Sequence, residues 1–349
     1  MKKIIHTLFI SITLSWCYLA QAQTPDEIFD KGVSSYNQKD YVQAFNYFEK
    51  AAHAGNTQAQ YELGEMYFSG KGTVVDIEQA YKWFEKSANQ GNADAQYRMG
   101  FLYAIGLNID QDYEKALEWL KKAVDQGHAK AQFATATIYR KKKYAHQSPT
   151  IVFDLYEKAA NQGHEEAQYE LGNMYRQGIG TTQSNTKAFE YYKKAALQDH
   201  TEAQYYLGVM YANGIGITQN YLEAYKWYEK SAEKGDARAQ YNLGALYHFE
   251  DTARQDYAKA LYWYEKSAAQ GYSKAQYNMG NMYQRGEGTE QDHAKALLLY
   301  EKAAEQGLTP AQYNLGLIYY KGIDVKKDDA KAKEWFNRAC QSGIRDACQ

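Results

Sequence analysis

The sequence is poor in proline, in net charge and in long apolar runs. Three prolines among 349 residues exclude a collagen-like or linker-rich chain. The 40 lysines and arginines nearly balance the 42 aspartates and glutamates, so the formal net charge is only −2. A chain with so weak a field does not attract nucleic acid, and we predict no nucleic-acid partner. Beyond residue 22, no segment is apolar enough to predict an integral membrane span.

Motifs of common catalytic sites are also missing. The sequence has no His-Glu-x-x-His metal motif, no phosphate-binding loop and no Gly-x-Ser-x-Gly nucleophile motif. We therefore predict a protein that is not an enzyme and that has neither a cofactor nor a bound metal.

What the chain has in excess is tyrosine. Hydrophobic residues make up 45 % and charged residues 23 % of the chain, the balance of a soluble folded protein. Tyrosine alone occurs 35 times. No single site requires so many copies, so tyrosine must belong to a repeated structural unit.

Residues 1–22 have the pattern of a cleavable secretory signal. Two lysines precede an apolar run from Ile4 to Ala20, which ends in the small-residue triplet Ala20-Gln21-Ala22. A membrane anchor is the alternative, but polar residues interrupt the run and it is short for a bilayer span. We expect an exported protein, periplasmic or secreted, with no integral membrane segment after cleavage.

A segment of the form Ala-x-Ala-Gln-Tyr-x-Leu-Gly-x-Met-Tyr recurs through the chain. Its glutamine returns every 36 residues, at Gln60, Gln96, Gln132, Gln168, Gln204, Gln240, Gln276 and Gln312. Such a fixed period is typical of stacked supersecondary units rather than of one globular core.

Each unit is predicted to contain two helices. In the first copy, Ala59, Leu63 and Met66 mark an apolar face at helical spacing, and Ala80 and Phe84 do so for the second helix. Residues at the same position of successive repeats form what we call a column. One column is occupied by good N-cap residues and predicts the starts of nine second helices: Asp40, Asp76, Asp112, Ser148, Ser184, Asn220, Asp256, Asp292 and Asp328. A glycine column predicts where these helices end, from Gly55 to Gly343, with Asp199 as the one substitution.

The loop between the two helices carries a glycine pair in several units, such as Gly70 with Gly72. With the Ala-x-Ala-Gln-Tyr segment before it and Asp-x-x-x-Ala-x-x-Trp-Tyr-x-Lys-Ser-Ala after it, this pattern resembles the Sel1-like repeat, a relative of the tetratricopeptide repeat. The third unit departs from the pattern at Thr135, Ala136 and the run Lys141-Lys142-Lys143. The sixth unit has Glu250 and Thr252 in place of its glycines.

The resemblance implies an all-α protein, a right-handed alpha-alpha superhelix or solenoid of nine antiparallel helix pairs. We divide it into a signal peptide (1–22), a tetratricopeptide-like N-terminal helix pair (23–56), eight Sel1-like repeats (57–343) and a truncated helix stub (344–349).

Two cysteines remain after signal cleavage, Cys340 and Cys348. In an exported chain they are expected to form a disulfide. Secreted cysteine-rich Sel1-repeat proteins are similar, since they bridge helices with this spacing. Closing so short a loop contributes about 2 to 3 kcal/mol in the chain-entropy model. Two unpaired buried thiols are the alternative.

Two further motifs have a structural and a chemical interpretation. His128, His164 and His200 share one column at the turn before a first helix, so we expect turn or capping roles rather than a shared metal. Ser184 and Ser231 each begin a Ser-x-x-Lys match, which occurs in penicillin-binding proteins. β-lactam binding or β-lactamase-like activity, as suggested for cysteine-rich relatives, is therefore the alternative function.

On the first helices most columns hardly change between units, whereas those of Glu62, Glu65 and Ser69 vary freely. These offsets lie along one helical face, and family analogy places that face on the concave wall. We call it the variable stripe. It holds, on or beside those columns, Glu62, Glu65, Arg98, Phe101, Glu170, Asn173, Arg176, Tyr206, Val209, Asn242, Asn278, Asn281, Arg285, Asn314 and Leu317.

The variable stripe predicts where a protein or peptide ligand binds. Asparagine can donate to and accept from a peptide backbone, and arginine can hold a carboxylate. The predicted binding residues are Arg98, Phe101, Arg176, Tyr206, Asn242, Asn278, Asn281, Arg285 and Asn314. The alternative is that these asparagines are only tolerated surface residues. The predicted function is an exported scaffold, an adaptor or regulator in the cell envelope.

Overall fold

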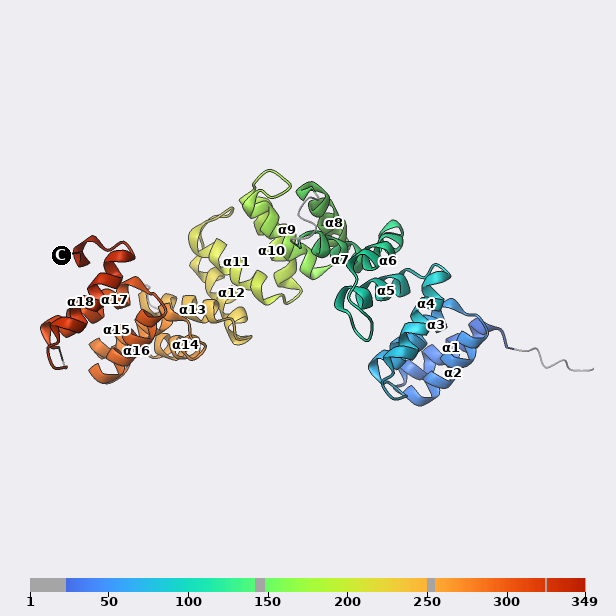
Figure 1. Cartoon of the computed structure of the whole chain (residues 1–349), viewed down its shortest axis with the longest axis horizontal. Helices are drawn as coiled ribbons and strands as arrows, with labels where there is room; N and C mark the ends of the chain where they lie inside the picture. Colours follow the sequence, from blue (N-terminus) through green and yellow to red (C-terminus); the bar gives the residue numbers. More distant parts are fainter. Residues whose placement is uncertain (1–22, 142–147, 250–254, 324, 349) are drawn as a thin grey trace, which may run out of the picture. The chain divides into compact units, whose positions relative to one another are not determined.

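The computed structural model describes residues 23–141, 148–249, 255–323 and 325–348 (Figure 1). Within these ranges the chain forms eighteen α-helices and one 3-10 turn, with no strand. The all-α solenoid of nine helix pairs is thereby confirmed. The predicted signal, Lys142, Lys143, Glu250 and Thr252 lie outside the described residues. In the described part, no helix is both long and apolar enough to cross a membrane.

The described helices form two compact units, which divide between His128 and Ala129. In the first, each helix packs on the next: α1 (Pro25–Asn37), α2 (Tyr41–His53), α3 (Thr57–Ser69), α4 (Ile77–Asn89), α5 (Ala93–Ile105) and α6 (Tyr113–Asp125).

The second unit continues the same alternation of helices. Its elements are α7 (Ala129–Tyr139), α8 (Pro149–Asn161), α9 (Glu165–Gln177), α10 (Asn185–Leu197), α11 (Thr201–Asn213), α12 (Tyr221–Glu233), α13 (Ala237–Phe249), α14 (Tyr257–Ala269), α15 (Ser273–Arg285), α16 (His293–Glu305), α17 (Thr309–Lys321), α18 (Asp329–Gln341) and η2 (Arg345–Ala347). The last is a single 3-10 turn at the place of the predicted helix stub.

The predicted caps are present at the start of all nine even-numbered helices. At α4 the Asp76 carboxylate accepts the amide hydrogen of Gln79, and at α8 Ser148 caps a helix whose first residue is Pro149. The predicted ends are present too, because the residues from Gly55 to Gly343 in the glycine column, and Asp199, have positive φ angles. Local sequence signals therefore fix where the second helices begin and end.

The glycine pair lets the inter-helix loop cross the preceding unit at close range. Gly72 has φ +73°, and a Cβ atom there would lie 2.1 Å from the carbonyl oxygen of Tyr41. Gly180 meets the carbonyl oxygen of Pro149 in the same way, at 2.3 Å. A side chain at either position would push the loop off the helix beneath it.

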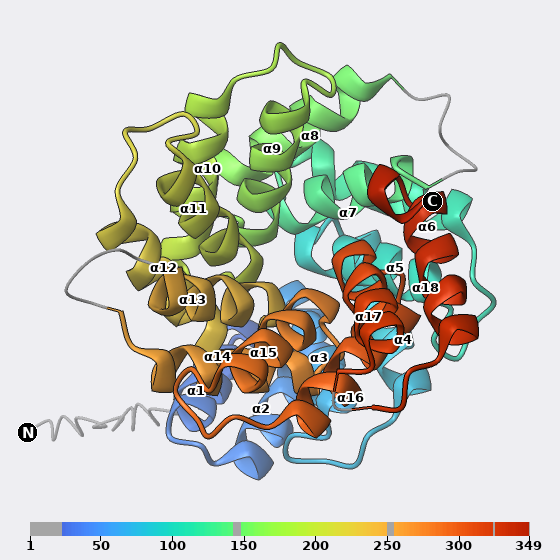
Figure 2. The same ribbon diagram turned by 90° about the vertical axis from the view of Figure 1, so that its left-hand side faces the viewer.

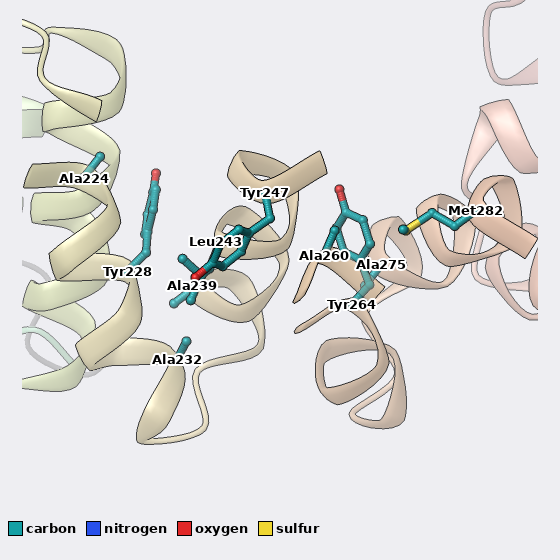
Figure 3. Close-up of a cluster of buried hydrophobic side chains, with 10 residues drawn as sticks. All are labelled: Ala224, Tyr228, Ala232, Ala239, Leu243, Tyr247, Ala260, Tyr264, Ala275 and Met282. Carbon is teal, nitrogen blue, oxygen red and sulfur yellow. The ribbon is translucent and has the colours of Figure 1, made fainter. Parts of the chain in front are cut away.

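The core consists of clusters of alanine, leucine, methionine and aromatic side chains between the helices. Figure 3 shows one stretch of it, in which Tyr228 and Tyr264 each stand beside the small and aliphatic side chains of neighbouring helices. These two rings, like Phe84 in an earlier unit, lie in one column of the second helices and are at most 3 % exposed. The facing first helix has glycine, as at Gly208, where a Cβ would be 2.5 Å from the Tyr228 ring. Part of the tyrosine excess is thus explained by the core, in which eight tyrosines of the described residues are buried.

The repeated glutamine forms a ladder of buried amides that joins successive units. The Gln240 amide donates to the carbonyl oxygen of Ala232, and its own oxygen accepts from Gln270 at 2.8 Å. Gln60 and Gln90 make the same contact at 2.7 Å. Because these glutamines are almost completely buried, the pairing satisfies polar atoms that water cannot reach.

The ladder is interrupted at two units, and the consequence is visible in both. The column of Gln270 holds Lys234 in one unit and Ser342 in another. The oxygens that would accept from them, Oε1 of Gln204 and of Gln312, are buried without a hydrogen-bond partner. The side chain missing from the column therefore leaves an unsatisfied acceptor.

We predict that Ser342→Gln stabilises the protein by up to about 1 kcal/mol, because it restores the partner of Gln312. The matched change Gln270→Ser should lower the free energy of unfolding by about 1–3 kcal/mol, because it leaves Gln240 with an unpaired oxygen. Thermal unfolding followed by circular dichroism measures both shifts. Unchanged melting curves for both variants would show that the ladder does not contribute to stability.

Candidate partner-binding face

The variable stripe lies on the odd-numbered helices. Figure 2 shows α9, α11, α13, α15 and α17 on the inner side of the curve of the second unit, with their even-numbered partners outside. Residues of the variable stripe on these helices, such as Tyr206, Val209 and Leu317, are half-buried. They lie beside the core columns yet keep part of their surface open to a partner.

In the first unit, the stripe residues contact one another. Arg98 on α5 forms a two-point ion pair with Glu65 on α3, in which its Nη2 atom lies 2.6 Å from Oε2. The guanidinium group also lies over the ring of Phe68, 5.5 Å from its centroid. Phe101 is half-buried and packs near Tyr97. The charge of Arg98 is thus neutralised within the protein.

In the second unit, α7, α8, α9 and α11 surround a cleft of about 460 Å³. Arg140 and Glu170 form an ion pair at 2.8 Å along its wall. Arg176 and Tyr206, two of the predicted binding residues, line the same cleft. The structure therefore brings these two together, although they belong to different repeats.

The asparagines of the stripe have a role that the sequence analysis missed. Asn281 accepts a hydrogen bond from the Tyr300 hydroxyl at 2.8 Å, and Asn278 donates to the Tyr264 hydroxyl at 3.1 Å. Both tyrosines are fully buried. A buried hydroxyl without a partner is costly, so these asparagines satisfy the polar ends of core side chains.

Two further asparagines of the stripe, Asn173 and Asn242, follow the same rule. Tyr192 donates to Asn173 at 2.8 Å. Burial raises the pKa of Tyr228, and a hydrogen bond with Asn242 opposes this shift. Asn314 differs, since it donates at 3.3 Å to the half-buried Tyr277. The asparagines are therefore neither free ligands for a peptide backbone nor idle surface residues.

A signal for this role was present in the chain's own repeats. The ring column holds phenylalanine or leucine at Phe48, Phe84, Leu120 and Phe336. No asparagine stands at the two adjoining stripe positions of any of those units, whereas Tyr192, Tyr228, Tyr264 and Tyr300 each have at least one. Four of the five tyrosines in this column are thus accompanied by an amide, and the hydroxyl of the fifth, Tyr156, lies near Thr137 and Arg140 instead.

Burial further favours the neutral form of these tyrosines. It raises the pKa of Tyr192 and of Tyr264 above the ordinary value for tyrosine. Nearby amide and guanidinium groups oppose that effect but do not cancel it. The hydroxyls stay neutral at physiological pH, and each can donate one hydrogen bond while accepting another.

The structure places Arg285 and the three histidines apart from any chemical centre. Arg285 is exposed, and its guanidinium lies 3.6 Å from Glu287. His164 and His200 cap α9 and α11 through Nδ1, as predicted. His128 stacks on Tyr97, and its Nε2 atom lies 3.0 Å from the carboxylate of Asp94. Among the described residues, no three His, Cys, Asp or Glu side chains are grouped as a metal site.

Both serines of the Ser-x-x-Lys matches have structural roles. Ser231 is fully buried and donates to the carbonyl oxygen of Thr201 at 3.0 Å. Ser184 caps α10 by accepting the amide hydrogen of Lys187. Neither geometry supports the alternative of a serine that attacks a β-lactam, since a nucleophile must be accessible and activated by a base.

The two cysteines lie at the C-terminal end of the second unit. The structure joins Cys340, on α18, to Cys348, directly after η2, with their Cα atoms 5.0 Å apart. This separation is within the usual range for disulfides. The bridge fastens η2 to α18, the helix on which it packs.

Stacked helix pairs of fixed length, with a ladder of buried amides between them, define the protein as an α-helical repeat solenoid. Its family follows from comparison with known proteins. The model of the Sel1 repeat matches residues 31–56, 57–92, 93–128, 153–164, 165–200, 201–236, 237–272, 273–308 and 309–344. The chain belongs to the Sel1 repeat family. The matched part is shortest in the unit that contains Thr135 and Ala136.

Two solved structures are similar over most of the chain. One is c5321, a protective antigen of uropathogenic Escherichia coli with an SLR fold. It is 32% identical, with a TM-score of 0.67, over 93% of this chain and 78% of that one. The other is a Sel1 repeat protein from Oxalobacter formigenes, also 32% identical, with a TM-score of 0.58, over 84% of this chain and 86% of that one.

A shorter similarity concerns HcpC of Helicobacter pylori, a protein named a putative beta-lactamase. It is 39% identical over 54 residues, which is 16% of this chain. The matched part spans 19% of the length of HcpC, about a fifth of that protein.

We predict that Asn278→Ala lowers the free energy of unfolding by about 1–3 kcal/mol, because the buried Tyr264 hydroxyl loses its partner. In a Tyr264→Phe background the same change should cost much less, because no hydroxyl remains to be satisfied. A double-mutant cycle from chemical unfolding measures this coupling. Asn213→Ala, on the exposed side of α11, is the control and should change stability by less than about 0.5 kcal/mol. Equal costs in both backgrounds would contradict the assigned role.

Proposed function

We propose that this protein is an exported scaffold that binds proteins or extended peptides along the variable stripe, as an adaptor or regulator in the cell envelope. A Sel1 repeat solenoid is typically a protein-interaction scaffold. The observation that carries the proposal is the inner face of the second unit, where half-buried side chains of several repeats line a cleft of about 460 Å³. The ligands bind non-covalently in the groove along the variable stripe, and the protein does not change them chemically.

The role of each stripe residue follows from how much of its bonding capacity the fold already uses. Asn278 and Asn281 are committed to core tyrosines, so they support the wall rather than grip the ligand. Arg98 is neutralised by Glu65. The apolar contacts with the ligand are made by four half-buried residues, Phe101, Tyr206, Val209 and Leu317. Shape and apolar contact dominate, with few charged contacts.

The partner-binding role predicts a specific loss of ligands from a stripe variant. Val209→Arg combined with Leu317→Arg places two charges on the inner face, whereas Leu298→Arg places one on the exposed outer face of α16. Mature wild type and both variants serve as bait in envelope extract, with quantitative mass spectrometry of the captured proteins. We expect partners held by wild type and the outer variant to be lost from the stripe variant.

Circular dichroism shows first that all three proteins are folded. The same captured set from wild type and from the stripe variant would overturn the assignment of this face.

Export is supported by the pattern of residues 1–22 and by the cysteine pair. We predict that the protein recovered from its native compartment begins at Gln23 and has no free thiol. Intact-mass analysis with and without reduction, after thiol alkylation, measures both properties. An unprocessed chain that begins at Met1, with Cys340 and Cys348 alkylated before reduction, would contradict export. As a control, Cys348→Ser should leave Cys340 open to alkylation in the mature protein.

A further inference from the structure

The cleft between α7, α8, α9 and α11 contains a guanidinium group that the fold positions but does not neutralise. Arg176 donates from Nε to the Tyr192 hydroxyl at 3.1 Å, and its Cζ atom lies over the Tyr206 ring, 5.2 Å from the centroid. Tyr192 is fully buried and is itself fixed by its bond to Asn173. The group is therefore oriented from two sides before any ligand arrives.

Arg176 differs in this respect from the other arginines of the inner face. Arg98 is paired with Glu65, and Arg140 with Glu170. Among the residues that the structure describes, no carboxylate forms an ion pair with Arg176. Its terminal nitrogens keep their hydrogen-bonding capacity beside a cleft of about 460 Å³.

The surroundings of Arg176 select the kind of anion. Arg140, Glu170 and Arg176 line the cleft, and because Glu170 is paired with Arg140, a single positive charge remains on Arg176 and matches one singly charged carboxylate. A carboxylate also matches the two-pronged donor geometry at the end of a guanidinium group. Val152 and Ile179 line the cleft as well and provide an apolar wall.

We infer that this cleft binds a carboxylate of an extended peptide through Arg176, with the adjacent apolar side chain of the peptide packed against Val152 and Ile179. The inference rests on the proposed peptide binding and names the chemistry of one subsite within it. The carboxylate at the C-terminal end of a peptide and that of an acidic side chain share this chemistry. Tyr192 acts as a positioning residue, since it orients Arg176 from the core.

Two degenerate hexapeptide libraries test the inference on immobilised mature protein. One library ends in a free carboxylate and the other in a carboxamide, and captured peptides are sequenced by mass spectrometry. We expect capture from the free library with apolar C-terminal residues enriched, and weak capture from the amidated one. Arg176→Gln should reduce this capture by about 10- to 100-fold, the usual effect of losing hydrogen bonds to a charged group.

Matched variants separate a lost ligand contact from a lost fold. Arg176→Lys keeps the charge but not the two-pronged geometry, so it should retain part of the capture. Arg338→Gln removes an arginine from α18 on the outer helices, paired there with Glu334, and should bind like wild type. Melting curves confirm that each variant is folded before binding is compared.

The outcomes distinguish the inference from the function on which it rests. Enrichment of aspartate or glutamate in the amidated library, lost in Arg176→Gln, would support the site and assign the carboxylate to a side chain. If the amount of captured peptide changed neither with amidation nor with Arg176→Gln, the carboxylate site would be wrong, whereas peptide binding would still hold. No capture of either library by wild type would overturn peptide binding itself.

Discussion

The structure depends on the contact between an aromatic ring of the second helix and the bare backbone of a glycine on the facing first helix, which recurs in every unit except those of Leu120 and Ala136. Where the ring is Tyr228, the facing residue is Gly208, whose missing side chain leaves room for it. The link to the next unit is separate, because Gln240 at the start of the following first helix donates across the turn to the carbonyl oxygen of Ala232. Because each unit must present the same surfaces to the next, the same columns recur along the chain.

Using tyrosine for that ring imposes a second constraint on the inner face. A phenylalanine would fill the same volume without a polar atom, as Phe84 does. Tyrosine carries its hydroxyl through the core toward the stripe, where an asparagine or threonine must meet it, as Asn281 meets Tyr300. Part of the variation along the inner face therefore reflects the core beneath it rather than a ligand above it.

This distinction changes how a repeat surface should be interpreted. A position that varies between repeats is free of the stacking constraint, but it can still be tied to a core residue in its own or the preceding unit. The internal satisfaction of Asn278 and Arg98, beside the unneutralised charge of Arg176, separates supporting residues from those with capacity left for a partner. This chain shares its scaffold with c5321 and with the Oxalobacter protein, whereas local differences of this kind determine the partner.

The 36-residue period, the caps from Asp40 to Asp328 and the glycine column predicted the number, starts and ends of the second helices. They could do so because capping and left-handed helix ends are decided by residues within one turn of the chain. The capping histidines were predictable for the same reason. The partners of the asparagines, the convergence of Arg176 and Tyr206 on one cleft, and the unpaired oxygens of Gln204 and Gln312 were decided only by tertiary structure. Each depends on atoms from two helices or two repeats, and spacing along one helix does not reveal which of them come within hydrogen-bonding distance.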